Sequence, residues 1–581
     1  MPLRRFLAIS LLTVFALGIL VFSGCSSPAA QAPAAEPTQA PAPAEEKPTQ
    51  PPAPAEEKPT QPSTSVEEKA ALTPDRLVPE VVFVFSTAEH DPARNELGIL
   101  LTQEWEKLGL RVKAQPMDYE KQVDLYGTGE GFNAFTLGYN GRPERFDPDV
   151  LLRRIYYTGL NFMGFSDPEI DALIDAQQAE MDVDKRREIV FKIQDMLASP
   201  GYLPAVVAWN EVDVDAYNSD LWENIQVAPG MGIYNYWTLL SATPKTDKTT
   251  FRVANTELPR NLNPFFETTG SDTEMMRELY DTLARIGLDS QPVPCAAESW
   301  EVIDPTTIHV VLRQGMQFSD GVPVTAKDVK YSYDIQKEQG SSIYKPFLKT
   351  IDSIEVVDDY NLIFHLVKPD ASIFMATFAQ IYIIPEHIWS QIPDPKADYD
   401  NNVNPIGSGP YILKEWRANE ELLTAANKNY QFPVGPEFYS EVIYANPDAI
   451  FQALVDQEAD VNYEPLSVIQ AQLAEAVPHL TVERKNSISI RVVGFNVRVA
   501  PFDDPAFRDA IGYTFDYDTI VNVILGGAGE PGAGVIAPAN EFWHSSNQLV
   551  REFNPDKARE ILAAAGYEWD ASGLLYMPAD N

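Results

Sequence analysis

The run Gly315-Met-Gln-Phe-Ser-Asp-Gly-Val-Pro-Val-Thr-Ala-Lys-Asp-Val-Lys-Tyr-Ser-Tyr-Asp334 carries the clearest local structural pattern of this chain. Thr325 and Asp328 have the spacing of a capping box, which predicts a helix that begins here and continues through Tyr333. Residues 300–313, just before the run, alternate between apolar and polar side chains as a strand does. A strand followed by a helix indicates an α/β fold.

A strand-helix-strand pattern lies between residues 81 and 116. Residues 81–85 form an apolar run typical of a strand, and Asp91 followed by Pro92 is typical of a helix N-cap and first helical position. Leucines at helical spacing continue to Gly109, which predicts the end of the helix, and residues 111–116 predict a second strand. Two strands joined by a helix favour a parallel sheet covered by helices.

Three more helices and one linker follow from local patterns. Asp167 and Pro168 predict the start of a helix, and residues 183–197 and 556–565 are amphipathic. Residues 241–250 are polar and break the pattern, so we expect a linker there and a new strand directly after it. At 581 residues the chain is longer than one hydrophobic core usually fills, and we expect two or more domains.

The first residues have the composition of an export leader. The basic pair Arg4-Arg5 precedes an apolar run at residues 6–21, and Phe22-Ser-Gly-Cys25 resembles a bacterial lipobox. The apolar run is short for a membrane span, which needs roughly 20 residues. We therefore expect residues 1–24 to be a lipoprotein signal peptide and Cys25 to carry the lipid. A helix retained as a membrane span is the alternative.

Residues 25–77, beginning at the lipidated cysteine, are expected to form a tether. The segment is rich in Pro, Ala, Glu and Thr, and the stretch from Pro37 to Lys47 recurs twice, the second time in degraded form. This composition favours extended conformations and cannot supply a packed core, so we expect the segment to be disordered and to hold the folded part away from the membrane. A protein-binding proline-rich motif is the alternative.

Charge and cysteine content narrow the possible partners. The formal charge is −40, so nucleic acids and anionic membrane surfaces would be repelled. We expect no nucleic-acid partner, and contact with the membrane through the lipid only. Cys295 is the other cysteine of two, so lipidation of Cys25 leaves it without an intramolecular disulfide partner. We interpret Cys295 as a small buried residue.

The chain has no recognisable catalytic or cofactor motif. It contains no Gly-x-Ser-x-Gly nucleophile elbow, no His-Glu-x-x-His metal motif and no Gly-x-x-x-x-Gly-Lys phosphate loop, and its 6 histidines are scattered. Among 84 acidic residues, pairs of carboxylates occur by chance and predict little. We therefore predict a protein that is not an enzyme, with no catalytic residues, no cofactor and no metal ligands.

The run at residues 315–334 resembles the signature of the extracellular solute-binding proteins of family 5, receptors for peptides, nickel chelates and related solutes that supply ATP-driven importers. Other elements of the family stand around it in the usual order: Asn261-Leu-Asn-Pro264, Ala297-Glu-Ser-Trp300, Leu312-Arg-Gln-Gly315, Pro405-Ile-Gly-Ser-Gly-Pro-Tyr411, Phe495-Asn496, Pro501-Phe-Asp-Asp504 and Pro555-Asp-Lys-Ala558. Residues 81–240, in contrast, resemble the carboxyl-terminal part of the family, with Gly138-Tyr-Asn-Gly-Arg142, Asp147-Pro-Asp149 and Asn161-Phe-Met-Gly164. We interpret the order of the chain as circularly permuted.

The resemblance implies an α/β, two-lobed, periplasmic-binding-protein-like fold of the large, cluster C type. Lobe II would be built from residues 78–231 together with residues 492–581, and lobe I would occupy residues 232–491. Permutation is tolerated where the original termini lie close together, so we expect the end of the chain beside the strand near position 83. A fused gene whose pieces form no common body, or a dimer that exchanges pieces, are alternatives to the expected monomer.

Carried over residue by residue, the resemblance implies a solute site between the lobes. The residues expected to line it are Glu257, Leu258 and Tyr344 in lobe I, and Tyr139, Asn140 and Arg142 in lobe II. The ring of Tyr139 would either stack on the solute or fill a gap at the hinge.

Arg142 departs from the family pattern. Peptide-binding relatives hold an aspartate at this position, which pairs with the α-ammonium of the ligand, whereas a guanidinium suits a carboxylate, a phosphate or a hydroxyl-rich solute. The following loop is longer here, and Glu144 or Asp147 could restore an amine site from it. Arg142 could equally be a structural salt-bridge partner.

These features predict an extracytoplasmic receptor, lipid-anchored to the cell membrane in the periplasmic space or at the cell surface. It would capture a peptide or similar small solute and deliver it to an ABC permease and its ATPases. A nickel-chelate receptor that binds metal chiefly through the chelator fits the same resemblance. Two other classes stay open: a sensor or surface-binding lipoprotein that does not transport, and an extracytoplasmic hydrolase.

Overall fold

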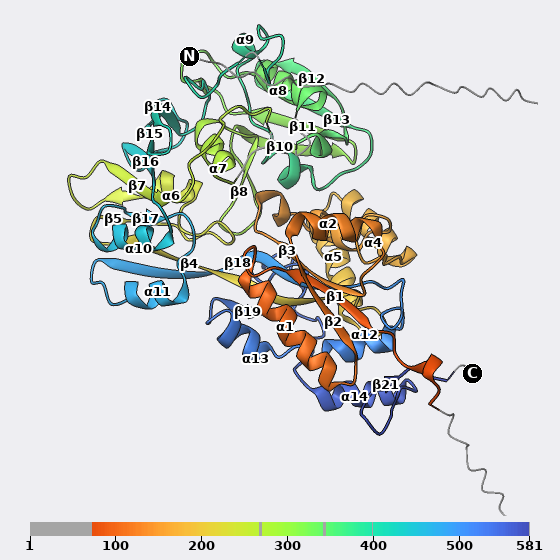
Figure 1. Ribbon diagram of the computed structural model, residues 1–581. Coiled ribbons are helices and arrows are strands. Elements are labelled where there is room, and N and C mark those ends of the chain that lie inside the picture. The colour runs from red at the N-terminus through yellow and green to blue at the C-terminus, as the bar shows by residue number, and fades with distance from the viewer. Residues whose placement is uncertain (1–71, 267–269, 341–343, 398, 580–581) are drawn as a thin grey trace, which may run out of the picture. The chain divides into compact units, whose positions relative to one another are not determined.

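A mixed sheet of 11 strands forms the centre of the structure (Figure 1). The structure is a computed structural model that describes residues 72–266, 270–340, 344–397 and 399–579. The predicted signal peptide, the lipid-attachment residue Cys25 and most of the predicted tether lie outside the described residues. None of the helices in the described part is long and apolar enough to cross a membrane.

The strands of the large sheet follow the order β14-β15-β16-β7-β17-β4-β18-β3-β1-β2, with β19 paired to β4. Their bounds are β1 Val81–Ser86, β2 Val112–Met117, β3 Ala134–Tyr139, β4 Ala205–Asn218, β7 Thr250–Asn255, β14 Tyr411–Arg417, β15 Glu421–Ala426, β16 Phe438–Ile443, β17 Val461–Asn462, β18 Leu480–Phe495 and β19 Gly529–Pro531. β1 pairs in parallel with β2 and with β3, which confirms the predicted parallel strand-helix-strand unit. The predicted α/β class is confirmed.

Strands β4 and β18 are the longest of the sheet, with 14 and 16 residues. The names lobe II, for residues 78–231 and 492–579, and lobe I, for residues 232–491, follow the division expected from the sequence. They are antiparallel, and their register runs from Leu480 opposite Asn218 to Gly494 opposite Ala205. One part of this pair joins β3 of lobe II, and β4 also joins β17 of lobe I near Tyr217. The pair therefore joins strands of lobe II at one end and a strand of lobe I at the other.

Lobe II surrounds strands β1–β3 with helices from both ends of the chain (Figure 1). Its helices are α1 Pro92–Lys107, α2 Tyr119–Thr128, η2 Pro143–Phe146, α3 Pro148–Tyr156, α4 Pro168–Ala179, α5 Val183–Ala198, α12 Pro505–Gly512, α13 Tyr517–Thr519, η5 Ile520–Ile524 and α14 Pro555–Ala564. Asp91, Asp167 and Asp182 each accept a hydrogen bond from a backbone N–H of the first turn of α1, α4 and α5. These N-caps explain why the predicted helix starts are confirmed.

Lobe I adds a four-stranded antiparallel sheet to its part of the large sheet. The strands of this smaller sheet, in spatial order, are β10 Ala297–Asp304, β11 Thr307–Leu312, β13 Asn361–Leu366 and β12 Ile351–Asp358. The helices are α6 Tyr236–Ser241, α7 Gly270–Leu279, α8 Ala326–Gln339, η3 Lys345–Leu348, η4 Ile373–Thr377, α9 Glu386–Trp389, α10 Pro447–Val455 and α11 Val468–Ala474. Short pairs complete the lobes: β5 Trp222–Glu223 with β6 Thr243–Pro244, β8 Ala284–Ile286 with β9 Pro292–Pro294, and β20 Glu568–Trp569 with β21 Leu575–Tyr576.

The run at residues 315–334 supports lobe I. The predicted capping box is present, because Oδ2 of Asp328 accepts hydrogen bonds from the backbone N–H and the hydroxyl of Thr325, both at 2.9 Å. Oδ1 of Asp328 accepts from the N–H of Glu386 at 3.0 Å, and the Ser332 hydroxyl accepts from the N–H of Ile384 at 2.9 Å. The run therefore ties α8 to the segment that begins α9.

The end of the described chain lies beside its beginning. Leu77 forms a β-bridge with Tyr576, and the N–H of Val78 donates to the carbonyl of Leu575 at 3.0 Å. Figure 1 shows η1 (Pro74–Arg76) next to the C-terminal segment, close to the start of β1. The expected proximity of the two ends is thus present in the described residues.

The last residues assigned to the tether belong to the folded body. The Arg76 guanidinium makes an ion pair with Glu568 at 3.1 Å and donates to the carbonyl of Met577. The N–H of Met577 in turn donates to the carbonyl of Arg76 at 2.7 Å. Residues 74–77 are therefore ordered by contacts with the C-terminal segment, and the predicted end of the tether at residue 77 is too late.

Cys295 is buried in lobe I, as predicted. Cys295 forms no disulfide, and its thiol donates a hydrogen bond to Oδ1 of Asp281 at 3.4 Å. Burial raises the pKa of this thiol to about 11, so it stays protonated at neutral pH.

Candidate functional site

A cavity of about 370 Å³ opens over the shared face of β4 and β18. Lobe II contributes residues 140–144, which follow β3, and lobe I contributes α7, η3 and Gln380 after η4. Residues 230–234 close the cavity from a third side. This volume lies within the range of small-molecule sites, roughly 300–1,000 Å³.

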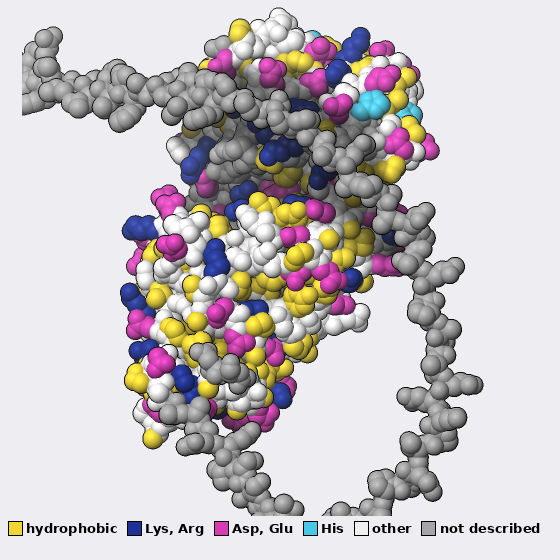
Figure 2. Space-filling model, turned by 90° about the vertical axis from the view of Figure 1, so that its right-hand side faces the viewer, with side chains coloured by type: hydrophobic (Ala, Val, Ile, Leu, Met, Phe, Trp, Pro, Cys, Tyr) yellow, Lys and Arg dark blue, Asp and Glu magenta, His cyan; other side chains and the backbone are white. Residues whose placement is uncertain are grey.

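Acidic side chains outnumber basic ones in the lining of the cavity. Figure 2 shows acidic and basic side chains interspersed over one face of the molecule. The cavity, in contrast, is lined by five carboxylates and two arginines, namely Glu144, Glu211, Asp213, Asp215, Glu274, Arg142 and Arg491.

Three of these carboxylates lie in a row along β4. Glu211, Asp213 and Asp215 alternate with valines, and side chains of a strand alternate between its two faces. Val214, between the two aspartates, is buried in the opposite direction, away from the cavity. We call Glu211, Asp213 and Asp215 the acidic row.

The members of the acidic row differ in their partners. Glu211 forms an ion pair with Arg491, which lies on β18. Asp215 accepts hydrogen bonds only from neutral groups, the N–H of Ile233 at 3.1 Å and the Nδ2 of Asn462 at 2.8 Å. Among the described residues, neither Asp213 nor Asp215 makes an ion pair.

A glycine allows the segment 230–234 to lie against Asp215. Gly232 has a φ of +60°, a conformation that L side chains rarely adopt. A Cβ at this position would lie 2.3 Å from Oδ2 of Asp215. Any larger residue at position 232 would therefore displace the Asp215 carboxylate.

The two aspartates have raised pKa values. Burial, followed by repulsion from Glu211, raises the pKa of Asp213 to about 6, against the opposing effects of Ser487 and Arg491. Burial, followed by repulsion from Asp213, raises the pKa of Asp215 to about 7. Two charges that repel each other in a poorly solvated place are stabilised by a cation brought in from outside.

On the lobe I side, Gln380 presents an unused hydrogen-bond donor. Its side chain is 5% exposed and lines the cavity. Oε1 of Gln380 accepts a hydrogen bond from Arg277 at 2.9 Å, whereas Nε2 has no hydrogen-bond partner among the described residues. A buried donor without a partner costs free energy unless a ligand supplies the acceptor.

Three of the six residues expected to bind the solute line the cavity, namely Asn140, Arg142 and Tyr344. Asn140 and Arg142 lie in the loop that follows β3, and Tyr344 comes just before η3. Arg142 is exposed, and its guanidinium makes no ion pair with any described residue. The alternative expectation that Arg142 is a structural salt-bridge partner therefore finds no support in the described part of the chain.

Tyr139 lies outside this cavity. It is the last residue of β3, opposite Ile490 of β18, and its ring faces a small neighbouring pocket lined by Phe162 and Arg154. Burial raises the pKa of its hydroxyl to about 12. The ring of Tyr139 therefore does not line the main cavity in this structure.

Glu257 and Leu258 also lie outside the cavity. The carboxylate of Glu257 pairs with Arg260 at 2.6 Å, and its carbonyl accepts a hydrogen bond from the Ser271 hydroxyl at 3.2 Å. Leu258 is buried. This loop therefore supports the start of α7, whose residues Thr273 and Glu274 reach the cavity.

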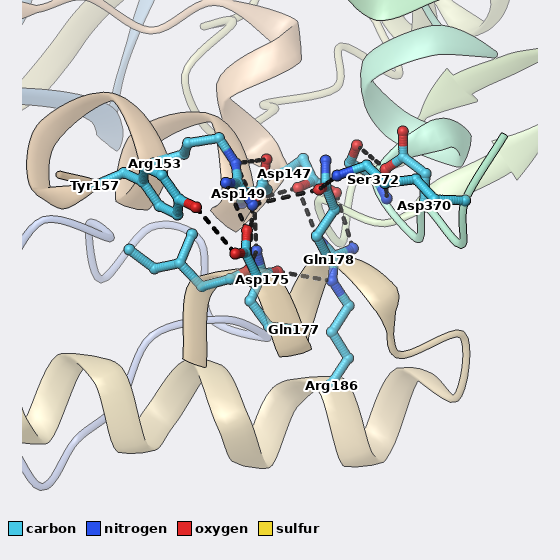
Figure 3. Close-up of polar contacts among 12 residues, drawn as sticks. Asp147, Asp149, Arg153, Tyr157, Asp175, Gln177, Gln178, Arg186, Asp370 and Ser372 are labelled. Carbon is cyan, nitrogen blue, oxygen red and sulfur yellow. Dashed lines mark hydrogen bonds and ion pairs between the residues drawn. The ribbon is translucent and has the colours of Figure 1, made fainter. Parts of the chain in front are cut away.

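Asp147 cannot restore an amine site, contrary to one expectation from the sequence. Its side chain is completely buried and accepts hydrogen bonds from Arg186 at 2.7 and 2.9 Å (Figure 3). Oδ1 of Asp147 also caps α3 by accepting from the N–H of Asp149. Glu144, the other residue considered for this role, does line the cavity.

Asp213, Asp215 and Gln380 were missed by reasoning from the sequence. The alternation Glu211-Val-Asp-Val-Asp215 was the available pattern, because it predicts a strand with carboxylates on one face and apolar side chains on the other. No comparable local pattern marks Gln380.

Comparisons with known proteins agree with the family suggested by the sequence. The model of bacterial extracellular solute-binding proteins, family 5 Middle, matches residues 291–580. The oligopeptide-binding protein AppA of Bacillus subtilis (strain 168) is 27% identical over 328 residues, which cover 55% of this chain and 59% of AppA. The glutathione-binding protein GsiB of Shigella flexneri serotype 5b (strain 8401) is 26% identical over 320 residues, which cover 54% of this chain and 61% of GsiB.

The aligned region spans about three fifths of the length of these curated relatives. The solved structure of AppA from Bacillus subtilis in complex with a nonapeptide aligns with a TM-score of 0.43 and 22% identity, over 57% of this chain and 67% of that chain. NikZ from Campylobacter jejuni in complex with Ni(L-His) aligns with a TM-score of 0.45 and 21% identity, over 57% of this chain and 66% of the NikZ chain. The part of the chain at residues 291–580 belongs to family 5 of the bacterial extracellular solute-binding proteins.

Proposed function

We propose that the protein is a lipid-anchored receptor outside the cytoplasm that captures a peptide or similar small solute between its lobes and delivers it to an ABC permease and its ATPases. The observation that carries this proposal is the cavity on β4 and β18, which is lined from both lobes. A solute that contacts both sides at once favours the closed arrangement of the lobes, which a permease can then recognise. Relatives named for binding oligopeptides and glutathione support a binding role rather than catalysis.

Native mass spectrometry of protein purified without denaturation tests this function. We expect a reproducible, non-covalent mass increment that disappears after denaturation and refolding, and that returns when the refolded protein is incubated with dialysable cell extract. Small-angle scattering should show compaction in the same step. Failure to retain any solute in either preparation would argue against a receptor, and a solute recovered in cleaved form would indicate a hydrolase.

The lipid anchor has its own test. We expect the full chain, expressed in a bacterium that processes lipoproteins, to fractionate with membranes, and the Cys25→Ala variant to be released in soluble form. A variant that still fractionates with membranes would contradict lipid attachment at Cys25. The expected monomer can be checked on the same soluble variant by light scattering, where a mass of two chains would indicate the exchanged dimer.

We also propose that the chain is circularly permuted, with lobe II formed by residues 78–231 and 492–581 and lobe I by residues 232–491. The contacts of Leu77 and Val78 with the C-terminal segment support this proposal, because they bring the ends together. A re-ordered chain that begins at residue 250 and joins residue 579 to residue 72 through a short linker should fold with nearly the same melting temperature. Failure of this chain to fold, while the original order folds, would contradict the permutation.

A further inference from the structure

The acidic row lines the cavity, and only one of its three carboxylates makes an ion pair with a described residue. Of its three carboxylates, Glu211 pairs with Arg491. Asp213 and Asp215 are left with hydrogen bonds from neutral groups, and they lie on the same face of the same strand, two residues apart. Two neighbouring carboxylates in a poorly solvated place are unfavourable unless a cation pairs with them.

No other cation-bearing side chain of the cavity reaches these two aspartates in an ion pair. The charged and titratable groups that line the cavity beside them are Glu211 on β4, Arg491 on β18, Arg142 and Glu144 in the loop after β3, Glu274 on α7, and the tyrosines at positions 234, 344 and 463. Arg491 already forms an ion pair with Glu211. The carboxylate of Glu274 lies 3.6 Å from the guanidinium of Arg277, a residue that does not line the cavity. The cavity is thus complementary to a ligand that is itself positively charged.

The described residues favour an organic cation over a metal ion as the partner of these two aspartates. Among the described residues, no group of three or more His, Cys, Asp or Glu side chains is arranged to hold a metal ion. The side chain of Gln380 is a second, independent feature, because the residue lines the same cavity and its buried Nε2 has no hydrogen-bond partner in the described part of the chain. A hydrogen-bond acceptor on the ligand would satisfy this donor, which a bare metal ion cannot do.

We propose that Asp213 and Asp215 bind an ammonium or guanidinium group of the solute, while Nε2 of Gln380 donates to a carbonyl or similar acceptor on the same solute. This inference rests on the proposed function and adds the charge of the solute and the residues that select it. It places the selecting carboxylates on strand β4, whereas the family resemblance implies an aspartate at position 142, which is an arginine here. The solute class is an organic cation with an acceptor group, such as a peptide with a free amino terminus.

Two matched pairs of probes test the cation requirement by calorimetry at pH 8. The first pair is tri-alanine and N-acetyl-tri-alanine, which differ in the α-ammonium group. The second pair is 1,4-diaminobutane and 1,4-butanediol, which have similar length and differ in charge. We expect each probe that carries an ammonium group to bind at least about tenfold more tightly than its counterpart without one, because buried charge pairs that lose one partner are weakened by this much or more.

Variants then assign the preference to the two aspartates. Asp213→Asn and Asp215→Asn should each remove most of the preference for the ammonium group, while binding of the uncharged 1,4-butanediol stays the same. Asp220→Asn is the matched control, since Asp220 is exposed just beyond the end of β4 and does not line the cavity. Gln380→Glu keeps an acceptor for Arg277 but removes the amide donor, so it should weaken tri-alanine and not the diamine, which has no acceptor.

A measurement on the unaltered protein keeps the test independent of how the variants fold. The diamine stays doubly protonated between pH 5 and pH 8, so a weaker affinity at pH 5 reports protonation of the protein. We expect at least about a tenfold loss at pH 5, because both aspartates are then largely neutral. The affinity for 1,4-butanediol should not change.

The proposal is overturned if neither pair shows a preference for the cation, or if Asp213→Asn and Asp215→Asn retain the preference of the Asp220→Asn control. These results differ from a failure of the proposed function. A solute without an ammonium or guanidinium group, recovered by native mass spectrometry, would leave the proposed receptor function intact and remove only the cation site.

Discussion

The guanidinium of Arg186 donates to both carboxylate oxygens of Asp147, at 2.7 and 2.9 Å, and neither side chain is more than 4% exposed (Figure 3). The same guanidinium donates to the carbonyl of Ala371 in lobe I at 3.2 Å. The N–H of Ala371 in turn donates to the carbonyl of Gln178 in lobe II at 2.7 Å. A buried ion pair of lobe II is thus part of a contact between the lobes.

Removal of Arg186 should destabilise the protein strongly. In Arg186→Met the carboxylate of Asp147 stays buried without its cation, and such a loss costs about 3–5 kcal/mol. We expect this decrease in the free energy of unfolding, measured by urea denaturation followed by circular dichroism.

The neighbouring residue provides the control for this measurement. Arg187 is 39% exposed in its side chain and lies 3.5 Å from the exposed Asp184. Arg187→Met should therefore cost less than about 1 kcal/mol. Equal effects of the two substitutions would contradict the structural role assigned to Arg186.

Local patterns predicted the helix ends but not this ion pair. Thr325 and Asp328 are three residues apart, and the capping box they form is present in the structure. Asp147 and Arg186 are 39 residues apart, and nothing in their local sequence predicts that they meet. For this reason the sequence left Asp147 as a possible ligand-binding residue, whereas in the structure it is a buried partner of Arg186.

The sequence also did not predict which side chains at the end of β3 point into the cavity. Tyr139 and Asn140 are adjacent in the chain, yet only Asn140 lines the main cavity, because neighbouring residues of an extended segment point to opposite sides. A displacement of one residue reverses this assignment. The acidic row could have been found, since Glu211-Val-Asp-Val-Asp215 predicts its shared face, but its position beneath both lobes required the pairing of β4 with β18.

The free protein should become more stable when Asp213 is replaced by asparagine. The pKa of Asp213 is raised to about 6 from an ordinary value of 3.8. Between pH 3.8 and about pH 6, the Asp213 carboxyl keeps a proton in the folded protein that it has already released in the unfolded chain. Ionisation of Asp213 therefore lowers the free energy of unfolding as the pH rises, and this destabilising effect is complete above about pH 6. Asn cannot ionise, so we expect Asp213→Asn to be more stable by about 1–3 kcal/mol at pH 8, with no difference near pH 3.

Chemical denaturation of ligand-free protein across this pH range measures the effect. Asp220→Asn should follow the unaltered protein at every pH, because Asp220 is exposed. A lower stability of Asp213→Asn at pH 8 would mean that the charge of Asp213 supports the fold, and it would contradict the assignment of Asp213 to a binding site.

Arg142 should matter only for solutes that carry a negative group. Its exposed guanidinium lines the cavity and makes no ion pair with the described residues, so it is free to pair with a carboxylate of the solute. We expect Arg142→Ala to weaken tri-alanine by about tenfold, which corresponds to about 1.4 kcal/mol. The affinity for tri-alaninamide, which lacks the carboxylate, should stay the same, as measured by calorimetry. Unchanged binding of both peptides would remove Arg142 from the site.

The contact between the chain's two ends can be measured through Leu575. This side chain is completely buried, and the backbone of Leu575 accepts a hydrogen bond from Val78 and donates to the carbonyl of Gly109 at 2.9 Å. Leu575→Ala leaves a cavity where the C-terminal segment packs beside β1, and we expect the free energy of unfolding to fall by about 2–5 kcal/mol. Leu574→Ala removes the same atoms from a partly exposed neighbour and should cost less than about 1 kcal/mol. Similar small effects of both substitutions would mean that the two ends do not pack together in solution, and the proposed permutation would lose its structural support.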